Sequence, residues 1–403
     1  MRRGLIVLLA TITALLMNGC WNRKELNELG IVIATAIDIG ANNQWELSFQ
    51  VVIPQSIATQ SGGGGGNQAP VTVFTTKGKT LEEAFRNASN ETSRSLFLAH
   101  NRVIILSEQV AKNGVNQVVD FYLRQSESRE TMDVFLTRGN SKKLLRVLIP
   151  LEKIPGNAID KMIQKGELGL STIRKINLHE FISTAADPSA SAILPEIKIS
   201  GEPGGQSSLE ALKKPRSSAV IKLGDIGVFK KDKLVGWLKR EESIGLAWLS
   251  NHIHSTVVVF PCAVDDRNSR ISSFRVENGA TSLKPKITNG ILKMTVDIKA
   301  SGTLNEMTCR SNLKNPEKIK ELEAKIQEQI KSDVKQTFDK AKKMHADTFG
   351  FGEIFHKKYP REWKKMSGSW SRTFKEIKLE VTVKVNIRRT GLINDPISKF
   401  IKI

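Results

Sequence analysis

The stretch PEKIKELEAKIQEQIKSDVKQTFDKAKKM, residues 316–344, is the longest helical pattern in this chain of 403 residues. Its apolar residues are spaced by three or four positions, which places them on one face of a helix; they are Ile319, Leu322, Ile326, Ile330, Val334, Phe338 and Ala341. The other face carries Lys, Glu and Gln. Because that face is not purely basic, we expect the helix to cover a sheet of its own domain rather than to form a coiled coil or lie on a membrane.

The segment Phe374–Ile387 follows the helix and alternates apolar with polar residues, so it predicts a long half-buried strand. Shorter strand patterns occupy residues 255–260, 272–277 and 291–300. Nearer the N-terminus, residues 31–38 and 45–53 predict a β-hairpin, and residues 110–124 predict one helix. This mixture indicates the α+β class, with mixed or antiparallel sheets flanked by helices and the long helix over the C-terminal sheet.

The length of the chain suggests two or three folded domains. Residues 201–218, GEPGGQSSLEALKKPRSS, are rich in Gly, Pro and Ser and are the best linker candidate. We therefore expect an N-terminal α+β domain over residues 20–149, a small middle domain over 150–200 and a C-terminal α+β domain over 219–403.

The N-terminus has the pattern of an export signal, predicted to span residues 1–19. Met1-Arg2-Arg3 is a short positive segment, and Gly4 to Met17 is apolar. A membrane-spanning helix needs about 20 apolar residues, so this segment is too short to be the lasting anchor.

The residues that end the apolar segment, Met17-Asn18-Gly19-Cys20, resemble the lipobox of bacterial lipoproteins. In that motif the cysteine receives a diacylglyceryl group and becomes the first residue after cleavage. We therefore expect Cys20 to be lipidated and to attach the protein to membrane lipid, since two or three acyl chains anchor stably. An ordinary secretory signal that happens to contain a cysteine is the alternative.

Two further cysteines, Cys262 and Cys309, remain in the exported chain. A disulfide between them is one outcome, because export leads to an oxidising compartment, and two buried free thiols are the other. The chain contains no CxxC pair and no Cys/His cluster with zinc-ligand spacing, so we expect neither a metal nor a cofactor.

The charge balance is strongly basic. The chain has 61 Lys and Arg against 41 Asp and Glu, a net charge of +20, and loss of Arg2 and Arg3 with the signal leaves +18. Basic chains often bind nucleic acid, but export and the lack of interleaved aromatic residues argue against it here. The excess fits a surface facing anionic lipid or a partner, or a solvated surface.

Signatures of catalysis are missing from the sequence. It contains no GxSxG, no HExxH and no complete P-loop. Nothing in the sequence therefore points to a catalytic residue, and we name none.

Four separate stretches resemble the Ger(x)C family of spore germination lipoproteins, and together they extend over essentially the whole chain. They are GCWNRKEL at 19–26, LAHNRVII at 98–105 with the later Arg124 and Arg129, GVFKKDKLVGWL at 227–238, and DTFGFG at 347–352 with the later Tyr359-Pro360 and Trp363.

The resemblance implies a three-domain, lipid-anchored, non-enzymatic subunit of a nutrient germinant receptor on the outer face of the spore inner membrane. Its partners would be the integral-membrane A and B subunits. Nutrient binding is associated with the B subunit in this family, so only Cys20 receives a defined role; His100 and Trp237 are expected to serve packing or turn stability. The alternative is an exported lipoprotein that binds a solute or acts on cell-wall material.

Overall fold

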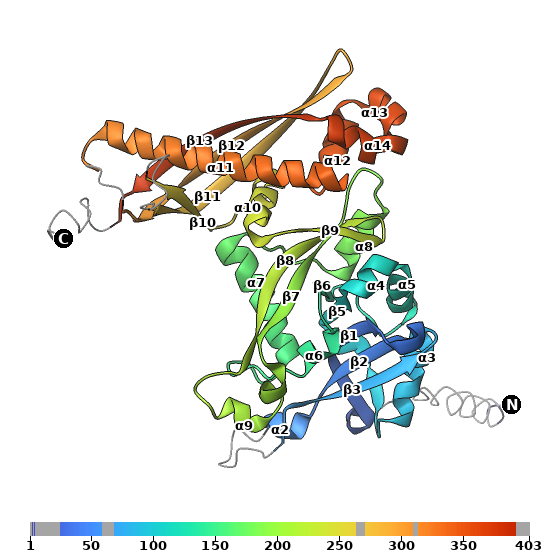
Figure 1. Cartoon of the computed structure of the whole chain (residues 1–403). Coiled ribbons are helices and arrows are strands. Elements are labelled where there is room, and N and C mark those ends of the chain that lie inside the picture. The colour runs from blue at the N-terminus through green and yellow to red at the C-terminus, as the bar shows by residue number, and fades with distance from the viewer. Residues whose placement is uncertain are drawn as a thin grey trace.

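The computed structural model describes residues 25–58, 68–262, 271–308 and 313–391, together with the isolated positions 2 and 4. Figure 1 shows an elongated molecule with the N-terminal elements at one end and the C-terminal sheet at the other. The described residues form a nine-stranded sheet and a four-stranded sheet.

The nine-stranded sheet has the order β3-β2-β1-β5-β6-β7-β8-β9, and β4 pairs with the start of β1. Its strands are β1 (Leu29–Ile39), β2 (Trp45–Val52), β3 (Val71–Gly78), β4 (Ser95–Phe97), β5 (Val103–Ser107), β6 (Asp133–Thr137), β7 (Ile193–Gly201), β8 (Ala219–Lys230) and β9 (Lys233–Leu238). The central pairs between β1, β5, β6 and β7 are parallel, and the outer pairs are antiparallel. The predicted hairpin of residues 31–38 and 45–53 is confirmed as β1 and β2.

Helices cover both faces of this sheet, so its central strand β5 is buried along its whole length. In β5, Ile104 and Leu106 join one apolar core while Val103 and Ile105 join another. The first core receives α3 (Leu81–Asn87), α4 (Glu108–Asn113), α5 (Asn116–Arg124) and α8 (Leu178–Ala186). The second receives α6 (Ser141–Leu145) and α7 (Pro155–Leu170).

The single helix predicted over residues 110–124 is wrong. The structure contains α4 and α5 instead, separated at Gly114, whose φ of +119° lies outside the helical region. Glycine adopts such a conformation without the steric penalty of a Cβ atom, so it ends the first helix here.

The four-stranded sheet has the order β10-β11-β12-β13 and carries a long helix on one face. Its strands are β10 (Thr256–Pro261), β11 (Ile271–Thr288), β12 (Ile291–Glu306) and β13 (Lys378–Arg389), and the helix is α11 (Pro316–Met344). The apolar stripe of α11 is buried from Leu322 to Ala341. The α+β class and the long helix over the C-terminal sheet are therefore confirmed.

The two sheets share one continuous apolar core. Between them lies α10 (Arg240–Leu249), which packs on α11 at Gly245, where an added Cβ atom would lie 2.2 Å from Thr337 Oγ1. The remaining helices are α2 (Pro54–Ala58), α9 (Leu209–Leu212), α12 (Phe351–Lys358), α13 (Pro360–Met366) and α14 (Trp370–Thr373). Among the described residues, no helix has the length and apolar character needed to cross a membrane.

Residues 201–218, expected to form a linker, are held to the rest of the N-terminal half. Residues 201–218 contain α9, and the fully buried Gln206 joins them to Leu148 by hydrogen bonds in both directions, 2.9 and 3.1 Å long. Strands β8 and β9 follow this span and belong to the same sheet as β1. The boundaries at residues 149, 200 and 218 stay predictions.

Candidate functional site at the junction of the two sheets

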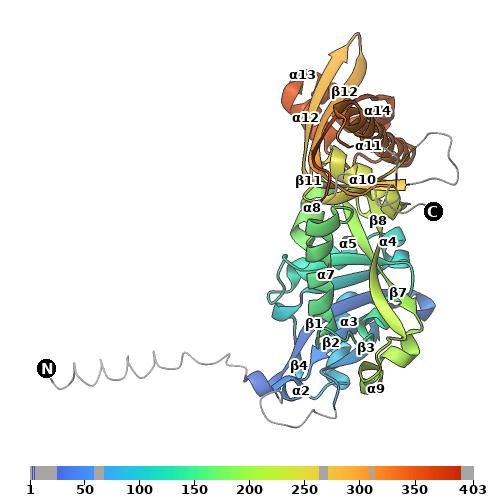
Figure 2. The same ribbon diagram turned by 90° about the vertical axis from the view of Figure 1, so that its left-hand side faces the viewer.

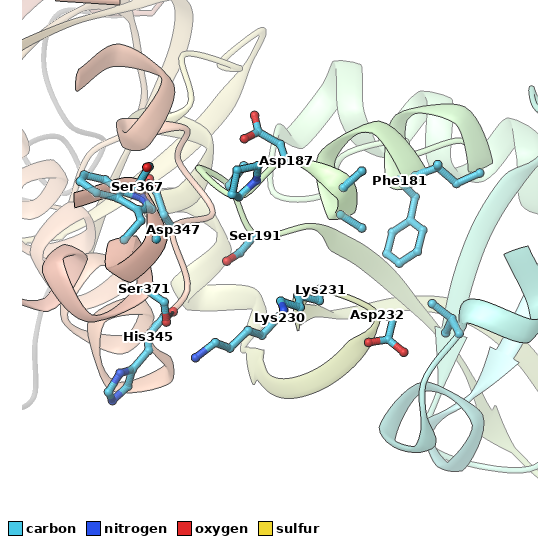
Figure 3. A pocket seen from close by; sticks show the side chains of 18 of the residues that line it. Phe181, Asp187, Ser191, Lys230, Lys231, Asp232, His345, Asp347, Ser367 and Ser371 are labelled. Atoms are coloured by element: carbon cyan, nitrogen blue, oxygen red, sulfur yellow. Dashed lines mark hydrogen bonds between the residues drawn. The ribbon is translucent and has the colours of Figure 1, made fainter. Parts of the chain in front are cut away.

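A cleft of about 950 Å³ lies where the two halves of the molecule meet (Figure 3). From the N-terminal half it is lined by α5, by α8 and the loop after it, and by the turn between β8 and β9. From the C-terminal half it is lined by the residues after α11 and by the segment 367–372, which extends into α14.

The wall on the C-terminal side is built around Asp347, which is 2 % exposed. Its carboxylate accepts hydrogen bonds from the backbone N–H groups of Phe349, Phe351 and Gly352, at 3.2, 3.1 and 2.7 Å, and from Trp370 Nε1 at 3.0 Å. Burial raises the pKa of Asp347 to about 6, although the four donors favour its ionised form. All four donors lie within 23 residues of Asp347, so this carboxylate organises the start of α12 and its contact with α14.

The same segment is joined to the N-terminal half. The carbonyl oxygen of Asp347 accepts a hydrogen bond from the backbone N–H of Ser191, 2.8 Å away. A Cβ atom added at Gly352 would lie 2.4 Å from the carbonyl oxygen of Ser189, so only glycine allows this approach. The stretch DTFGFG therefore holds the two walls of the cleft together.

The floor of the cleft is apolar. Ile182, Ala185 and Val119 line it between α8 and α5. Beneath them Phe181 is 2 % exposed and packs edge-on against Phe229, with ring centroids 5.1 Å apart.

The rim is cationic. Lys230, Lys231 and Arg372 are exposed, and within the part of the chain that the structure describes their side chains form no ion pair or hydrogen bond. In Figure 3, Lys230 extends toward Ser371 and His345. Partial burial and the positive charges of Lys375 and Lys230 lower the pKa of His345, which indicates a positive potential at this side of the cleft.

Two carboxylates besides Asp347 line the cleft, but they leave the cations unpaired. Asp187 accepts a hydrogen bond from the backbone N–H of Ser189 at 2.7 Å. Asp232 lies in the turn between β8 and β9, where its carbonyl oxygen accepts a hydrogen bond from Val115. Neither forms an ion pair with a described lysine or arginine of the rim.

A second, smaller pocket of about 240 Å³ is lined by residues 99–102 of the stretch LAHNRVII. Here Lys175 Nζ lies 3.1 Å from Asp133 Oδ2 and 2.8 Å from Asp160 Oδ1, and Arg102 NH1 lies 3.3 Å from Asp160 Oδ2. Burial raises the pKa of Asp133 to about 7 despite the charge of Lys175. Arg129 also lines this pocket, so parts of one family-like pattern that are separate in sequence meet in space.

The two residues expected to serve packing or turn stability are seen in detail. His100 ends a 3₁₀ turn, is exposed, and lies 5.8 Å from the ring centroid of Phe97. Trp237 donates a hydrogen bond from Nε1 to Glu108 at 2.9 Å and stacks under the guanidinium of Arg138, 4.2 Å from its ring centroid. His100 also lines the second pocket.

Of the three cysteines named from the sequence, Cys20, Cys262 and Cys309, only Cys262 lies in the described part of the chain. Cys20 and Cys309 lie outside the described residues, and Cys262 Sγ lies 3.5 Å from Thr308 Oγ1. Within the described ranges no three His, Cys, Asp or Glu side chains are arranged to hold a metal ion. The cationic rim was not predicted, because Arg372 is far in sequence from Lys230 and Lys231 and no spacing pattern relates them.

Both halves of the chain match models of known protein families. Residues 22–199 match the model described as the spore germination protein N-terminal domain, and residues 224–391 match the model described as spore germination B3/GerAC like, C-terminal. Spore germination protein KC of Bacillus subtilis (strain 168) is 30 % identical over 98 % of each chain. Spore germination protein B3 of the same organism is 25 % identical over 93 % of this chain and 95 % of its own.

One solved structure, the crystal structure of the GerBC protein, is similar in fold. Its TM-score is 0.54, with 21 % sequence identity, and the match covers 88 % of this chain and 96 % of that one. At this level of identity the likeness concerns the fold alone.

Proposed function

The chain belongs to the Ger(x)C family of spore germination proteins, and on this premise we propose that it is the non-enzymatic C subunit of a nutrient germinant receptor. The observation that carries the proposal is the match of both halves to germination-protein models, with a relative 30 % identical over 98 % of the chain. In this role it acts with integral-membrane A and B subunits to trigger germination.

The proposal includes a lipid anchor at Cys20 on the outer face of the spore inner membrane. Four residues lie between Cys20 and Glu25, so the Cα atoms of these two residues are five steps apart along the chain and at most about 18 Å from each other. Figure 2 shows β1, β2 and β3 at the end of the molecule away from the C-terminal sheet. With this anchor, the N-terminal half is nearest the membrane, and the C-terminal sheet extends away from it.

A deletion strain tests the receptor role. Spores that lack the chain are expected to lose their response to one class of nutrient, because the remaining subunits no longer form a working receptor. Re-expression of the full chain restores the response. If deletion spores germinate at the normal rate with every nutrient tried, the receptor role is wrong.

A second candidate function is direct binding of a small solute, and the polar pocket around Lys175 favours it. Thermal unfolding of the full chain with amino acids, sugars and wall fragments distinguishes the two. A ligand present at 100 times its dissociation constant adds about 2.7 kcal/mol to the free energy of unfolding. A clear rise in the midpoint with one solute supports binding, and no rise with any of them supports the subunit role alone.

A further inference from the structure

One large apolar side chain, Leu151, is almost completely exposed. Its exposed fraction is 97 %, higher than that of any other large apolar side chain in the described part of the chain. It lies at the tip of a tight turn, in which the backbone N–H of Glu152 donates a hydrogen bond to the carbonyl oxygen of Ile149 at 3.3 Å. Exposed leucines are common on protein surfaces, so the surroundings of this turn decide what it does.

The turn lies at the end of the molecule where the main chain enters the fold. Just after it, the backbone N–H of Gly156 donates a hydrogen bond to Gln50 Oε1 at 2.9 Å, and a Cβ atom added at Gly156 would lie 2.7 Å from Ile33 Cγ2. Ile33 belongs to β1, and β1 begins at Leu29, four residues after Glu25. The turn and the proposed lipid anchor are therefore at the same end of the molecule.

The helix α7 connects this end with the C-terminal half of the molecule. Figure 2 shows α7 running along the long axis, and its 16 residues make it about 24 Å long. At its far end, the side chain of Ser171 accepts a hydrogen bond from the backbone N–H of Ser255, which is 3.1 Å away and directly precedes β10. Leu168, which is 62 % exposed, lies at that end, so it is the counterpart of Leu151 farther from the anchor.

The residues around the turn are rich in cations. Residues 141–153 carry four Lys or Arg against one acid, and residues 201–218, which are hydrogen-bonded to this segment through Gln206, carry three against two. Two of the three acids already pair with lysines of the chain. Figure 1 and Figure 2 both show α9, which belongs to the second stretch, at the end of the molecule away from the C-terminal sheet. The exposed cations of the two stretches are Lys143, Arg146, Lys153, Lys213, Lys214 and Arg216.

We infer that this end of the molecule docks on anionic lipid, with Leu151 inserted among the headgroups and the exposed cations of residues 141–153 and 201–218 close to the lipid phosphates. The inference rests on the proposed function, because the lipid anchor at Cys20 holds this end at the membrane. An apolar side chain among cations fits the boundary between headgroups and acyl chains. Lys and Arg near an anionic surface add to the attraction, and the tether keeps lipid close enough for a weak contact to be occupied.

Positive charge alone does not select this end. Residues 351–366, which form α12 and α13, carry five Lys or Arg against two Glu, and both views show them beside the C-terminal sheet. The large apolar side chains of that segment are buried or half-buried, and the segment lies far from the proposed anchor. It therefore provides a matched control for charge.

Site-specific photo-crosslinking in spore membranes tests the inference with the full, lipidated chain. A photoreactive amino acid replaces Leu151 in one strain and Leu168 in another, so that the two labels lie near opposite ends of α7. The expected product at position 151 is an adduct with a phospholipid, identified by mass spectrometry. The label at position 168 is not expected to form it, because this position is farther from the membrane.

The charge dependence of the adduct tests the role of the cations. Lys213→Gln with Lys214→Gln is expected to reduce the phospholipid adduct at position 151 about ten-fold, because two attractions to anionic headgroups are lost. Lys364→Gln with Lys365→Gln removes the same charge from α13 and is expected to leave the adduct unchanged. High salt is expected to reduce the adduct of the parent chain, since it screens exposed charges. Both double variants are expected to unfold at the wild-type temperature, since all four side chains are exposed.

Four results would overturn the inference: no phospholipid adduct at position 151, an adduct there with protein alone, equal phospholipid adducts at positions 151 and 168, or an equal effect of the two double variants. Incorporation of a fatty-acid analogue at Cys20 is measured in the same membranes. If Cys20 is labelled in any of those four cases, the docking surface is wrong and the anchor stands. If Cys20 is not labelled, the proposed anchor is wrong, and the adduct at position 151 alone decides the docking surface.

Discussion

The indole Nε1 of Trp370 donates a hydrogen bond to the carboxylate of Asp347, 3.0 Å away, and both side chains are buried. This bond joins α14 to the segment that follows α11, and three backbone N–H groups share the same carboxylate. One side chain therefore holds together the wall of the junction cleft.

Replacing Asp347 by Ala is expected to lower the free energy of unfolding by about 3 kcal/mol, because four donors lose their acceptor in a buried site. Urea denaturation measures the change. Asp339→Ala, at an exposed position of α11, is the matched control and is expected to cost less than about 1 kcal/mol. Equal losses in the two variants would contradict the role given to Asp347.

The carboxyl group of Asp133 predicts a specific dependence of stability on pH. Burial raises its pKa from 3.8 to about 7, so the native state keeps a proton that the unfolded chain has lost. The free energy of unfolding therefore falls as the pH rises from about 4 to about 7, on the order of 4 kcal/mol in all from this group. Asp133→Asn stays neutral and removes that part of the slope.

Denaturation of the wild type and Asp133→Asn at pH 5 and pH 8 measures this slope. Asp120→Asn is the control, because the bond to Arg124 lowers the pKa of Asp120 and its titration lies below that range. If the free energy of unfolding changes by the same amount between pH 5 and pH 8 in the wild type and in Asp133→Asn, Asp133 is already ionised in the native state.

Arg138 is predicted to be indispensable for the junction of β6, β7 and β8. Its guanidinium lies 3.2 Å from both oxygens of Glu196, whose side chain is 1 % exposed, and 2.8 Å from Asp225. Arg138→Ala is expected to cost about 3 kcal/mol, since it leaves a buried carboxylate without its cation. Calorimetric unfolding checks this.

Replacing Arg138 by Lys keeps the positive charge but changes the shape of the cationic group, so it tests which of the two matters. Arg138→Lys is expected to recover less than half of the loss, because an ammonium neither bridges two oxygens nor stacks on Trp237 as a planar guanidinium does. Arg124→Ala breaks only an exposed pair and is expected to cost less than about 1 kcal/mol. Full recovery by lysine would show that only the charge matters.

Cys20→Ala is expected to abolish lipid labelling and to release the protein from spore membranes, because one thiol carries the whole proposed anchor. Metabolic labelling with a fatty-acid analogue and membrane fractionation measure both effects. Cys262→Ser, which leaves the lipobox intact, is expected to remain labelled and bound. Retention of the Cys20→Ala protein in the membrane would mean that another attachment exists.

We propose that Cys262 and Cys309 form a disulfide, supported by the 3.5 Å between Cys262 Sγ and Thr308 Oγ1, the residue directly before Cys309. Alkylation of the denatured exported chain is expected to modify neither cysteine before reduction and both after it, by mass spectrometry. Closing a loop of about 47 residues adds about 4 kcal/mol of stability in the chain-entropy model. Alkylation of both without reductant would identify free thiols.

The sequence by itself determined the α+β class and the position of its principal elements. The stripe over residues 316–344 predicted α11 with the bounds that the structure has, and the alternation over 374–387 predicted β13 within a few residues. These patterns succeed because helix and strand periods are local properties, set by which side chains one face of an element buries. The interruption at Gly114 was missed, since the apolar pattern continues across a glycine whose backbone conformation only the packed structure sets.

Only the tertiary structure decided which charged side chains lie close together. Lys230 is the last residue of β8, Lys231 lies in the turn between β8 and β9, and Arg372 comes from α14. The carboxylates of Asp133, in β6, and Asp160, in α7, both contact the ammonium group of Lys175, which lies in the segment after α7. No local period relates such residues, because their distances depend on the register of strands and on the packing of helices far apart in the chain. The sequence therefore predicted the elements, and the packing between them created the cleft.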